Sequence, residues 1–306
     1  MKTNLTIYLE KVFPFLVLIS ATLAFYQPEL FLWVKPYTPF LLGAIMMCIG
    51  LVIDTASLKA NFSSAHKLSL VVIAKFIFLS FLGFFLGMIT DLPLEIMIGL
   101  VIVGVCPGGV AANVMSYLSK SNVALAVVLT IVTTVLCPII MPAIIYLLLH
   151  QVVSVPFEKI VHKLFWIVSF PLIDGLIIRR FFLKQVEKVT WIFPPISILL
   201  IVVIIGFVAA SNRDMLLNNS WLIAGLVLFM NLSGYLAGYC LSGLLDYDKN
   251  SRKTISFEFG IQDSSIGIVL ATTFFSPLSA LPSALFSIIQ NLTAPILVNF
   301  FKEKRN

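Results

Sequence analysis

Two short stretches of this chain put helix-breaking or polar residues inside otherwise apolar sequence. The first, 106–113, reads Cys-Pro-Gly-Gly-Val-Ala-Ala-Asn, and the second, 257–265, reads Phe-Glu-Phe-Gly-Ile-Gln-Asp-Ser-Ser. A helix interrupted at membrane depth offers free amides to an anion and free carbonyls to a cation. Such backbone is tolerated only where it is buried in protein or lines a watery cavity. The paired interruptions therefore predict a carrier whose binding site lies at the two breaks.

Glu258 is the side chain in these stretches with the clearest chemical meaning. A carboxylate in a membrane-spanning segment costs roughly 2.5 kcal/mol or more and usually marks an ion pathway or a partner. A purely structural ion pair is the alternative for Glu258, and a simple kink is the alternative for the Pro107-Gly108 pair. Asn113, just beyond the first interruption, favours a site over a kink.

The composition predicts that these stretches are positioned by transmembrane helices. Of the 306 residues, 60% are hydrophobic and 11% are charged, and the mean hydropathy is +1.06, whereas about a quarter of the residues in soluble domains are charged. A spanning helix needs about 20 mostly apolar residues. Ten such blocks lie at residues 12–26, 38–56, 66–89, 94–119, 122–149, 160–178, 190–210, 219–244, 254–275 and 279–301. The expected fold is an all-α, polytopic membrane protein.

The distribution of positive charge predicts the orientation of these helices. The net charge of +6 follows topology and does not indicate nucleic-acid binding. If both termini are cytoplasmic, the outer loops hold few basic residues, and nearly all the others lie inside, as the positive-inside rule requires. Those in the outer loops are Lys35, Lys159, Lys163 and Arg213. We expect residues 12–26 to be retained as the first helix and not cleaved as a signal peptide.

A weak internal similarity predicts that the two halves are repeats. Residues 129–138 and 286–295 place hydroxyl or amide residues and a proline in the same register. Each would be the last helix of its half, so residues 1–150 and 151–306 would each contribute five spans, with a linker near 150–158. An odd number of spans per half makes the second copy run upside down, which is the inverted repeat of many secondary transporters.

Five separate segments resemble the bile acid:sodium symporter family, in matching order and spacing. They are residues 106–118, 122–125, 231–239, 258–264 and 275–282. Bacterial members of this family look like the apical sodium-dependent bile acid transporter and include pantothenate-type carriers. The resemblance implies a panel of helices one, two, six and seven beside a core of helices three, four, five, eight, nine and ten. Helices four and nine would unwind and cross, with substrate near the crossover and two sodium ions behind it.

The resemblance also implies the cation ligands. The first sodium site would involve Asn113, Thr130 and Glu258. The second would use Glu258, Gln262, the backbone carbonyls of Phe259 and Ile261, and a helix-three glutamine that is Lys75 in this chain.

Several positions depart from the family pattern. Ala112 and Ala126 stand where serine ligands are usual, which leaves Thr133 or water to replace them. Lys75 is itself a monovalent cation, so we expect it to occupy the second sodium site, although it could instead snorkel toward water. Asp263 replaces a common asparagine. Glu258 and Asp263 formally carry two negative charges and Lys75 one positive charge, which leaves room for a single sodium ion or proton, and Lys75 with Asp263 is a candidate proton-carrying pair.

The implied substrate is a small organic acid of the bile-acid, pantothenate or keto-acid type, moved by alternating access. Contacts are expected from Val110, Ala111, Asn113, Asp263, Gln290 and Asn291. Gln290 and Val110 replace a histidine and a threonine of the family, so we expect few hydroxyls in this pocket. A sodium/proton antiporter or an uncoupled uniporter using the same crossover are the alternatives.

Other classes of protein fit less well. An intramembrane enzyme needs a nucleophile or metal constellation, and the sequence contains none, with its three histidines all near span ends. The four cysteines fall in apolar blocks, as expected of small buried hydrophobic residues. We expect no cofactor beyond Na⁺ or H⁺ as coupling ion, no obligate protein partner, no nucleic acid, and a bacterial inner membrane as the location.

Overall fold

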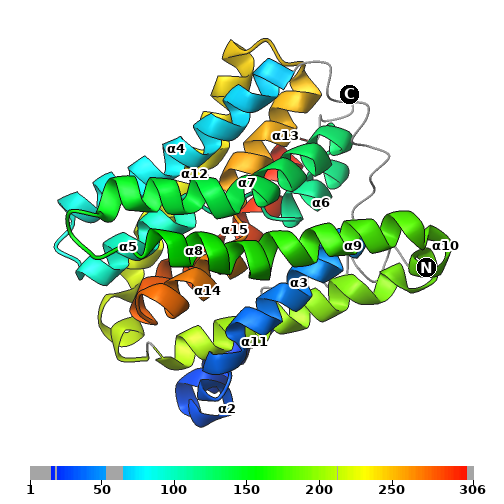
Figure 1. The fold of residues 1–306 in the computed structure, drawn as a ribbon. Coiled ribbons are helices and arrows are strands. Elements are labelled where there is room, and N and C mark those ends of the chain that lie inside the picture. The colour runs from blue at the N-terminus through cyan, green and yellow to red at the C-terminus, as the bar shows by residue number, and fades with distance from the viewer. Residues whose placement is uncertain (1–14, 18, 53–64, 212, 302–306) are drawn as a thin grey trace.

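Helices are the regular secondary structure of the described part of the chain. The computed structural model describes residues 15–17, 19–52, 65–211 and 213–301 (Figure 1). The helices in the first half are α2 (Glu29–Leu32), η1 (Lys35–Tyr37), α3 (Thr38–Val52), α4 (Ala65–Ile89), α5 (Leu94–Gly104), α6 (Ala111–Leu118) and α7 (Val123–Leu149). The second half contains α8 (Phe157–Leu164), η4 (Phe165–Ser169), α9 (Phe170–Phe181), α10 (Leu183–Val189), η5 (Thr190–Ile192), α11 (Phe193–Ser211), α12 (Arg213–Leu244), α13 (Lys249–Gly260), α14 (Ser264–Phe274), η6 (Leu278–Ala280) and α15 (Leu281–Phe301). These residues form no strand, so the all-α prediction is confirmed for them.

Seven helical stretches in the described residues are long and apolar enough to cross a membrane. They are Glu29–Val52, His66–Ile89, Val123–Leu149, Phe157–Phe181, Leu183–Ser211, Trp221–Leu244 and Leu278–Phe301. Each overlaps one of the predicted blocks. The other three blocks, 12–26, 94–119 and 254–275, contain shorter apolar helices. The predicted multi-pass membrane protein is therefore confirmed, while the count of ten spans stays a prediction; residues 12–14, 18 and 53–56 of the predicted blocks, and both termini, lie outside the described residues.

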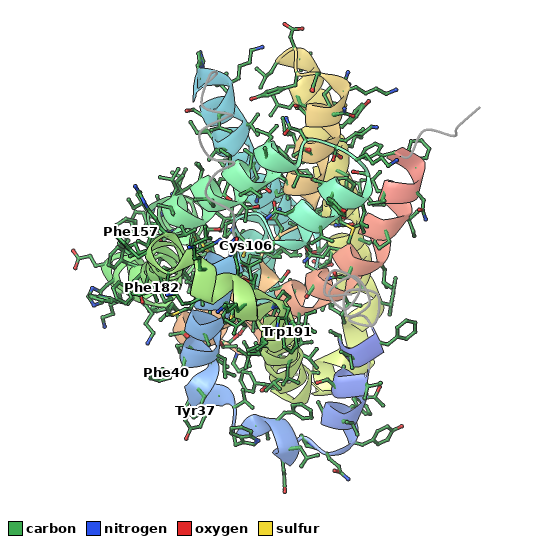
Figure 2. The ribbon with its side chains drawn as sticks, turned by 90° about the vertical axis from the view of Figure 1, so that its right-hand side faces the viewer. Tyr37, Phe40, Cys106, Phe157, Phe182 and Trp191 are labelled. Carbon is green, nitrogen blue, oxygen red and sulfur yellow. The ribbon has the colours of Figure 1, made fainter. Side chains whose placement is uncertain are left out.

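The surface of these helices is suited to lipid. Figure 2 shows Cys106 in the interior and large aromatic side chains at the periphery. Cys106 is fully buried, whereas Phe40 is 77% exposed. The other labelled exposed aromatic residues are Tyr37, Phe157, Phe182 and Trp191. Apolar side chains that point outward are expected where hydrocarbon and not water surrounds the protein.

Both interruptions predicted from the sequence are helix breaks. Helix α5 ends at Gly104 and α6 begins at Ala111, while α13 ends at Gly260 and α14 begins at Ser264. Each break lies within a single predicted block, so the two halves of an apolar segment are joined by a few residues of extended or turning backbone. This arrangement places unpaired helix ends inside the molecule.

The helices pack in two neighbouring sets. Helix α3 packs against α9 and α11, and α2 packs against α11. Helices α4, α5, α12, α13 and α15 pack among one another, with α7 against α4 and α13. In Figure 1, α2, α3 and α11 lie at the bottom of the view and α4, α12 and α13 at the top. Helices α14 and α15 contact both sets.

Close packing of α4 against α5 brings Lys75 to the first break. A side-chain carbon at Gly83 would lie 2.5 Å from the carbonyl oxygen of Leu100, and one at Gly104 would lie 2.4 Å from that of Leu79. Only glycine permits such a close approach of two helix backbones. Because α5 ends at Gly104, the middle of α4 is held beside the first break, and Lys75 lies there.

Candidate functional site

The two breaks are joined directly by backbone hydrogen bonds. Gly108 and Gln262 form an isolated antiparallel bridge. The amide of Gly109 donates to the carbonyl of Ile261 at 3.1 Å, and the amide of Asp263 donates to the carbonyl of Pro107 at 2.9 Å. Segments more than 150 residues apart in sequence thus meet as a minimal two-stranded ladder in the interior.

Side chains from other helices satisfy the remaining backbone groups of the second break. Asn231 of α12 donates its amide to the carbonyl of Gly260 at 2.7 Å. Gln290 of α15 accepts from the amide of Gln262 at 2.8 Å and donates to its carbonyl at 3.0 Å. Buried backbone groups without partners are costly, so these two side chains stabilise the break. Gln290, which the sequence predicts as a substrate contact, therefore also positions the backbone.

Glu258 lies at the centre of a group of oxygens that we call the carboxylate cluster, in which Glu258, Thr130 and Thr133 are buried and Asn113 is half-buried. The Thr130 hydroxyl lies 3.2 Å from Asn113 Oδ1 and 3.4 Å from Glu258 Oε2. The Thr133 hydroxyl lies 3.3 Å from Glu258 Oε1 and accepts from the amide of Gly108 at 3.2 Å. Hydroxyl–oxygen hydrogen bonds are usually 2.5–3.0 Å long, so these oxygens are loosely bonded. Oxygens from a carboxylate, an amide and hydroxyls are the ligands that a hard cation takes.

The structure thus brings together the three residues predicted for the first sodium site, and Thr133, which the sequence offers as a replacement for a missing serine, lies beside them. Glu258, Thr130 and Thr133 are at most 1% exposed. Gly108 lies directly against the carboxylate, because a side-chain carbon there would fall 1.8 Å from Glu258 Oε1. The glycine of the first break is therefore needed to admit Glu258 of α13.

Lys75 forms a second group of buried polar atoms, the lysine cluster, with Gln262 and the carbonyl of Cys106. The ammonium of Lys75 donates to Gln262 Oε1 at 2.7 Å and to the Cys106 carbonyl at 2.8 Å. Lys75 is fully buried, so it does not snorkel to the surface. In the described part of the chain its hydrogen-bond partners are these neutral oxygens and neither Glu258 nor Asp263.

The backbone oxygens predicted for the second sodium site already accept hydrogen bonds. The carbonyl of Phe259 accepts from Gln262 Nε2 at 2.8 Å, and that of Ile261 accepts from the Gly109 amide. The Gln262 side chain thereby links Lys75 to α13. A positive charge and N–H donors surround the oxygens that would otherwise face a second cation.

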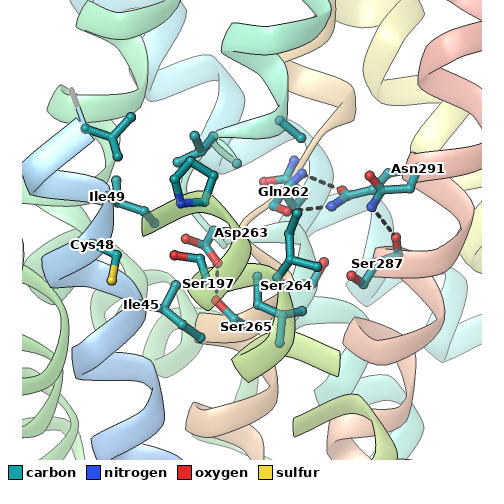
Figure 3. Close-up of a pocket in the computed structure, with 18 residues that line it drawn as sticks. Ile45, Cys48, Ile49, Ser197, Gln262, Asp263, Ser264, Ser265, Ser287 and Asn291 are labelled. Atoms are coloured by element: carbon teal, nitrogen blue, oxygen red, sulfur yellow. Dashed lines mark hydrogen bonds between the residues drawn. The ribbon is translucent and has the colours of Figure 1, made fainter. Parts of the chain in front are cut away.

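A cavity of about 160 Å³ opens beside the paired breaks. Figure 3 shows Ile45, Cys48 and Ile49 of α3 on one side, Ser287 and Asn291 of α15 on the other, and Asp263, Ser264 and Ser265 between them. Helix α11 contributes Ser197. The cavity therefore lies between the α3–α11 pair and the breaks.

Most of the predicted substrate contacts line this cavity. They are Val110, Ala111, Asp263, Gln290 and Asn291. Asn113 does not line it and instead contacts Thr130 in the carboxylate cluster. The Asp263 carboxylate accepts a hydrogen bond from Ser265, and Asn291 donates to the Ser287 carbonyl at 2.6 Å.

The expectation of few hydroxyls is wrong. Four serines line the cavity, Ser197, Ser264, Ser265 and Ser287. Two of these, Ser264 and Ser265, belong to the 257–265 stretch, whereas Ser197 comes from an apolar helix whose position the family motifs do not reveal. The hydroxyl of Ser264 is buried and has no hydrogen-bond partner among the described residues, which leaves it available to a ligand.

Two helix N-termini open onto the same cavity. Helix α6 begins at Ala111 and α14 begins at Ser264, and both residues line the cavity wall. The first turn of a helix carries partial positive charge and free amides that favour an anion. Asp263 supplies an opposing negative charge at the same wall. The cavity is consequently polar along the breaks and apolar along α3.

Paired broken helices around a buried carboxylate, in a multi-pass helical protein, define the architecture of a membrane transporter. Comparison with known proteins gives the family. Residues 39–219 match the model of the Sodium Bile acid symporter family, and the chain belongs to that family.

Its relatives include bacterial and plant proteins. The chain is 38% identical over 288 residues to the uncharacterized sodium-dependent transporter YocS of Bacillus subtilis (strain 168), covering 94% of this chain and 90% of that protein. It is 30% identical over 292 residues to the probable sodium/metabolite cotransporter BASS1, chloroplastic, of Arabidopsis thaliana, covering 95% and 73% respectively. The chain is 28% identical over 299 residues to the probable sodium/metabolite cotransporter BASS2, chloroplastic, of Oryza sativa subsp. japonica, covering 97% of this chain and 71% of that protein.

Proposed function

We propose that this protein is a secondary active transporter that moves a small organic anion across the membrane, coupled to a single cation. The observation that carries the proposal is the fully buried ammonium of Lys75, which donates to Gln262 and to the Cys106 carbonyl where the two breaks meet. An ammonium held there replaces the second sodium ion of the family. The carboxylate cluster is left as the site of the coupling ion, sodium or a proton.

The charges at the breaks support one coupling ion. Glu258, Asp263 and Lys75 together carry one formal negative charge, which one monovalent cation neutralises. In the carboxylate cluster, Asn113, Thr130 and Glu258 offer oxygens of the kind that sodium takes. The sodium-dependent and sodium/metabolite names of the relatives favour sodium over a proton.

The cavity supports a small anion as the substrate. Its volume of about 160 Å³ lies below the roughly 300–1,000 Å³ of pockets for drug-sized ligands, which favours a short organic acid over a steroid. The substrate's carboxylate would bind near the first turns of α6 and α14, where the Ser264 hydroxyl has no partner among the described residues and the helix dipoles favour an anion. Val110, Ala111 and Asn291 would form the rest of the wall, with Asn113 acting through the cation site.

The proposed mechanism is alternating access between two parts of an inverted repeat. Residues 1–150 and 151–306 would form the repeats, with helices one, two, six and seven as a panel and the other six as a core. The location of the cavity between α3 and α11 on one side and the breaks on the other supports a rocking of panel against core. We place the protein in a bacterial inner membrane with both termini in the cytoplasm, as the distribution of Lys and Arg favours.

Ligand-induced thermal stabilisation tests this function. The purified protein is heated with a panel of organic acids, in sodium or choline, at several pH values. We expect a short organic acid to stabilise the protein in sodium and much less in choline. Stabilisation that depends on pH and not on sodium would make the proton the coupling ion, and stabilisation by cations alone, with no acid effective, would favour a sodium/proton antiporter. An acid that stabilises equally under every ionic condition would indicate an uncoupled uniporter and contradict the proposal.

A further inference from the structure

A second, larger cavity lies away from the breaks, at the outer face of α12, α13 and α15. It has a volume of about 690 Å³, and the residues that line this groove run along α12 from Leu228 to Tyr239 and along α15 from Thr293 to Phe301. Its apolar wall includes Leu232 and Leu236 of α12 and Ile296 and Phe300 of α15. Leu236 is 65% exposed and Ile296 is 69% exposed. In a membrane protein such side chains face hydrocarbon, so this wall is suited to a fatty acyl chain.

One end of the groove is basic. Lys249 and Lys253, one turn apart on α13, both line it. Lys253 is only 7% exposed, and among the described residues no hydrogen-bond acceptor or carboxylate pairs with its ammonium. The ammonium itself is not enclosed, so it reaches the groove, where a bound anion can pair with it.

Two neighbouring charged side chains, Arg252 and Asp248, are engaged elsewhere and do not pair with Lys253. Arg252 stacks its guanidinium over Tyr239, 4.2 Å from the ring centroid, and its Nε has no partner among the described residues. The nearest acid along the chain, Asp248, is engaged as the N-cap of α13, where it accepts from the amide of Ser251. The carboxylate of Asp248 is therefore directed to the helix backbone, and neither it nor Asp246 lines the groove.

We propose that this groove binds an anionic phospholipid, with an acyl chain along α12 and α15 and its phosphate at Lys249 and Lys253. An amphiphile fits because the lining is mostly apolar along α12 and α15, and both of its lysines lie in the first turns of α13. A second copy of this chain would have to supply a negative group to the same end, and an inorganic anion would leave the apolar wall unused. Basic residues at the membrane surface attract anionic lipids. The bound lipid would hold the first turns of α13, whose other end carries Glu258.

The test measures lipid binding to the full chain purified in neutral detergent, by native mass spectrometry and by thermal stability. We expect phosphatidylglycerol to bind and to raise the melting temperature more than phosphatidylcholine, and inorganic phosphate to leave the temperature unchanged. Lys253→Gln should weaken phosphatidylglycerol binding roughly fivefold, while Lys184→Gln, at an exposed lysine on α10, should not weaken it. Ile296→Trp, which fills the apolar wall, should also reduce phosphatidylglycerol binding.

Three results would overturn the proposal. The first is equal binding of phosphatidylglycerol and phosphatidylcholine, and the second is unchanged phosphatidylglycerol binding by the folded Lys253→Gln variant. The third is a shift between monomer and dimer caused by Ile296→Trp with no loss of lipid, which would assign the groove to a second copy. Because the readout is lipid binding, it does not depend on transport or on the coupling ion.

Discussion

The carboxylate cluster and the lysine cluster lie at the same pair of breaks but hold their polar atoms differently. In the carboxylate cluster, the hydroxyls of Thr130 and Thr133 lie 3.3–3.4 Å from the oxygens of Glu258. In the lysine cluster, the ammonium of Lys75 makes hydrogen bonds of 2.7 and 2.8 Å. One group is loosely bonded and negatively charged, and the other is tightly bonded around a built-in cation. Only the carboxylate cluster therefore combines negative charge with loosely bonded oxygens, which is why we propose it as the ion site.

Removing the negative charge of the carboxylate cluster should weaken sodium binding more than any other single change. In Glu258→Gln, the cluster loses its only formal charge, so sodium should bind about a hundredfold more weakly, equivalent to roughly 3 kcal/mol. The measurement is the sodium concentration that half-maximally stabilises the purified protein. A matched Glu95→Gln change, on α5 and outside both clusters, should have no such effect. If Glu258→Gln needed the same sodium concentration as the unchanged protein, the carboxylate cluster would not be the ion site.

The second largest loss of sodium binding is expected when a side chain at position 108 crowds the Glu258 carboxylate. Gly108→Ala places a side-chain carbon where Glu258 Oε1 lies, so the carboxylate must move away from Thr130 and Thr133. We expect about tenfold weaker sodium binding and a stability loss of about 1–3 kcal/mol. Gly225→Ala is the control, because a side-chain carbon at Gly225 meets nothing within 4 Å. Normal sodium binding by Gly108→Ala would show that the position of the carboxylate is not critical.

Removing the Thr133 hydroxyl should weaken sodium binding less than either change above. Thr133→Val leaves the Gly108 amide without its acceptor and Glu258 without one hydroxyl, which should cost about 1–2 kcal/mol of stability and weaken sodium binding a few-fold. Thr133→Ser keeps the hydroxyl and should keep sodium affinity. Chemical denaturation and sodium titration of both variants provide the measurement. Equal sodium affinity in the valine and serine variants would exclude Thr133 as part of the ion site.

The smallest effect is expected for a change in the cavity wall opposite the breaks, where it should weaken binding of the organic acid only. Ser197→Ala should weaken binding of the best organic acid by roughly 0.5–1.5 kcal/mol and leave the response to sodium alone unchanged, because Ser197 lies outside both clusters. The control is Ser242→Ala, since the Ser242 hydroxyl bonds to Gly238 of its own helix. Titration of the acid at saturating sodium measures the effect. A loss of the response to sodium in Ser197→Ala would show that the cavity and the ion site are not separable.

The two breaks and the helices could be predicted from the sequence, because they depend on local composition. Pro107, Gly108 and Gly109 mark the first break because they disfavour a continuous helix, and Glu258 marks the second because a carboxylate is rare in an apolar segment. The all-α fold and most helix positions can be predicted from the long apolar segments. A segment that crosses lipid must pair its backbone groups internally, and a helix does so.

The remaining features depend on packing between distant segments. Nothing around Ser197 distinguishes it from a hydroxyl that bonds to its own helix, yet α11 brings it to the cavity. Gln290 reads as a substrate contact, but its amide is paired with the backbone of Gln262. Asn231 belongs to a family-like segment whose role, holding the carbonyl of Gly260, becomes visible only once α12 and α13 are placed side by side.

We propose that Lys75 takes the place of one sodium ion, so the Lys75→Gln variant should depend on sodium differently from the unchanged protein. Uptake of the best organic acid into proteoliposomes is measured against sodium concentration for the unchanged protein and for Lys75→Gln, with Lys67→Gln as the control near the end of the same helix. Sodium-dependent stability of the purified variant shows that it is folded. We predict that sodium dependence changes in Lys75→Gln, with an additional sodium ion required per substrate, and stays the same in Lys67→Gln. Uptake by Lys75→Gln with unchanged ion dependence would contradict the account.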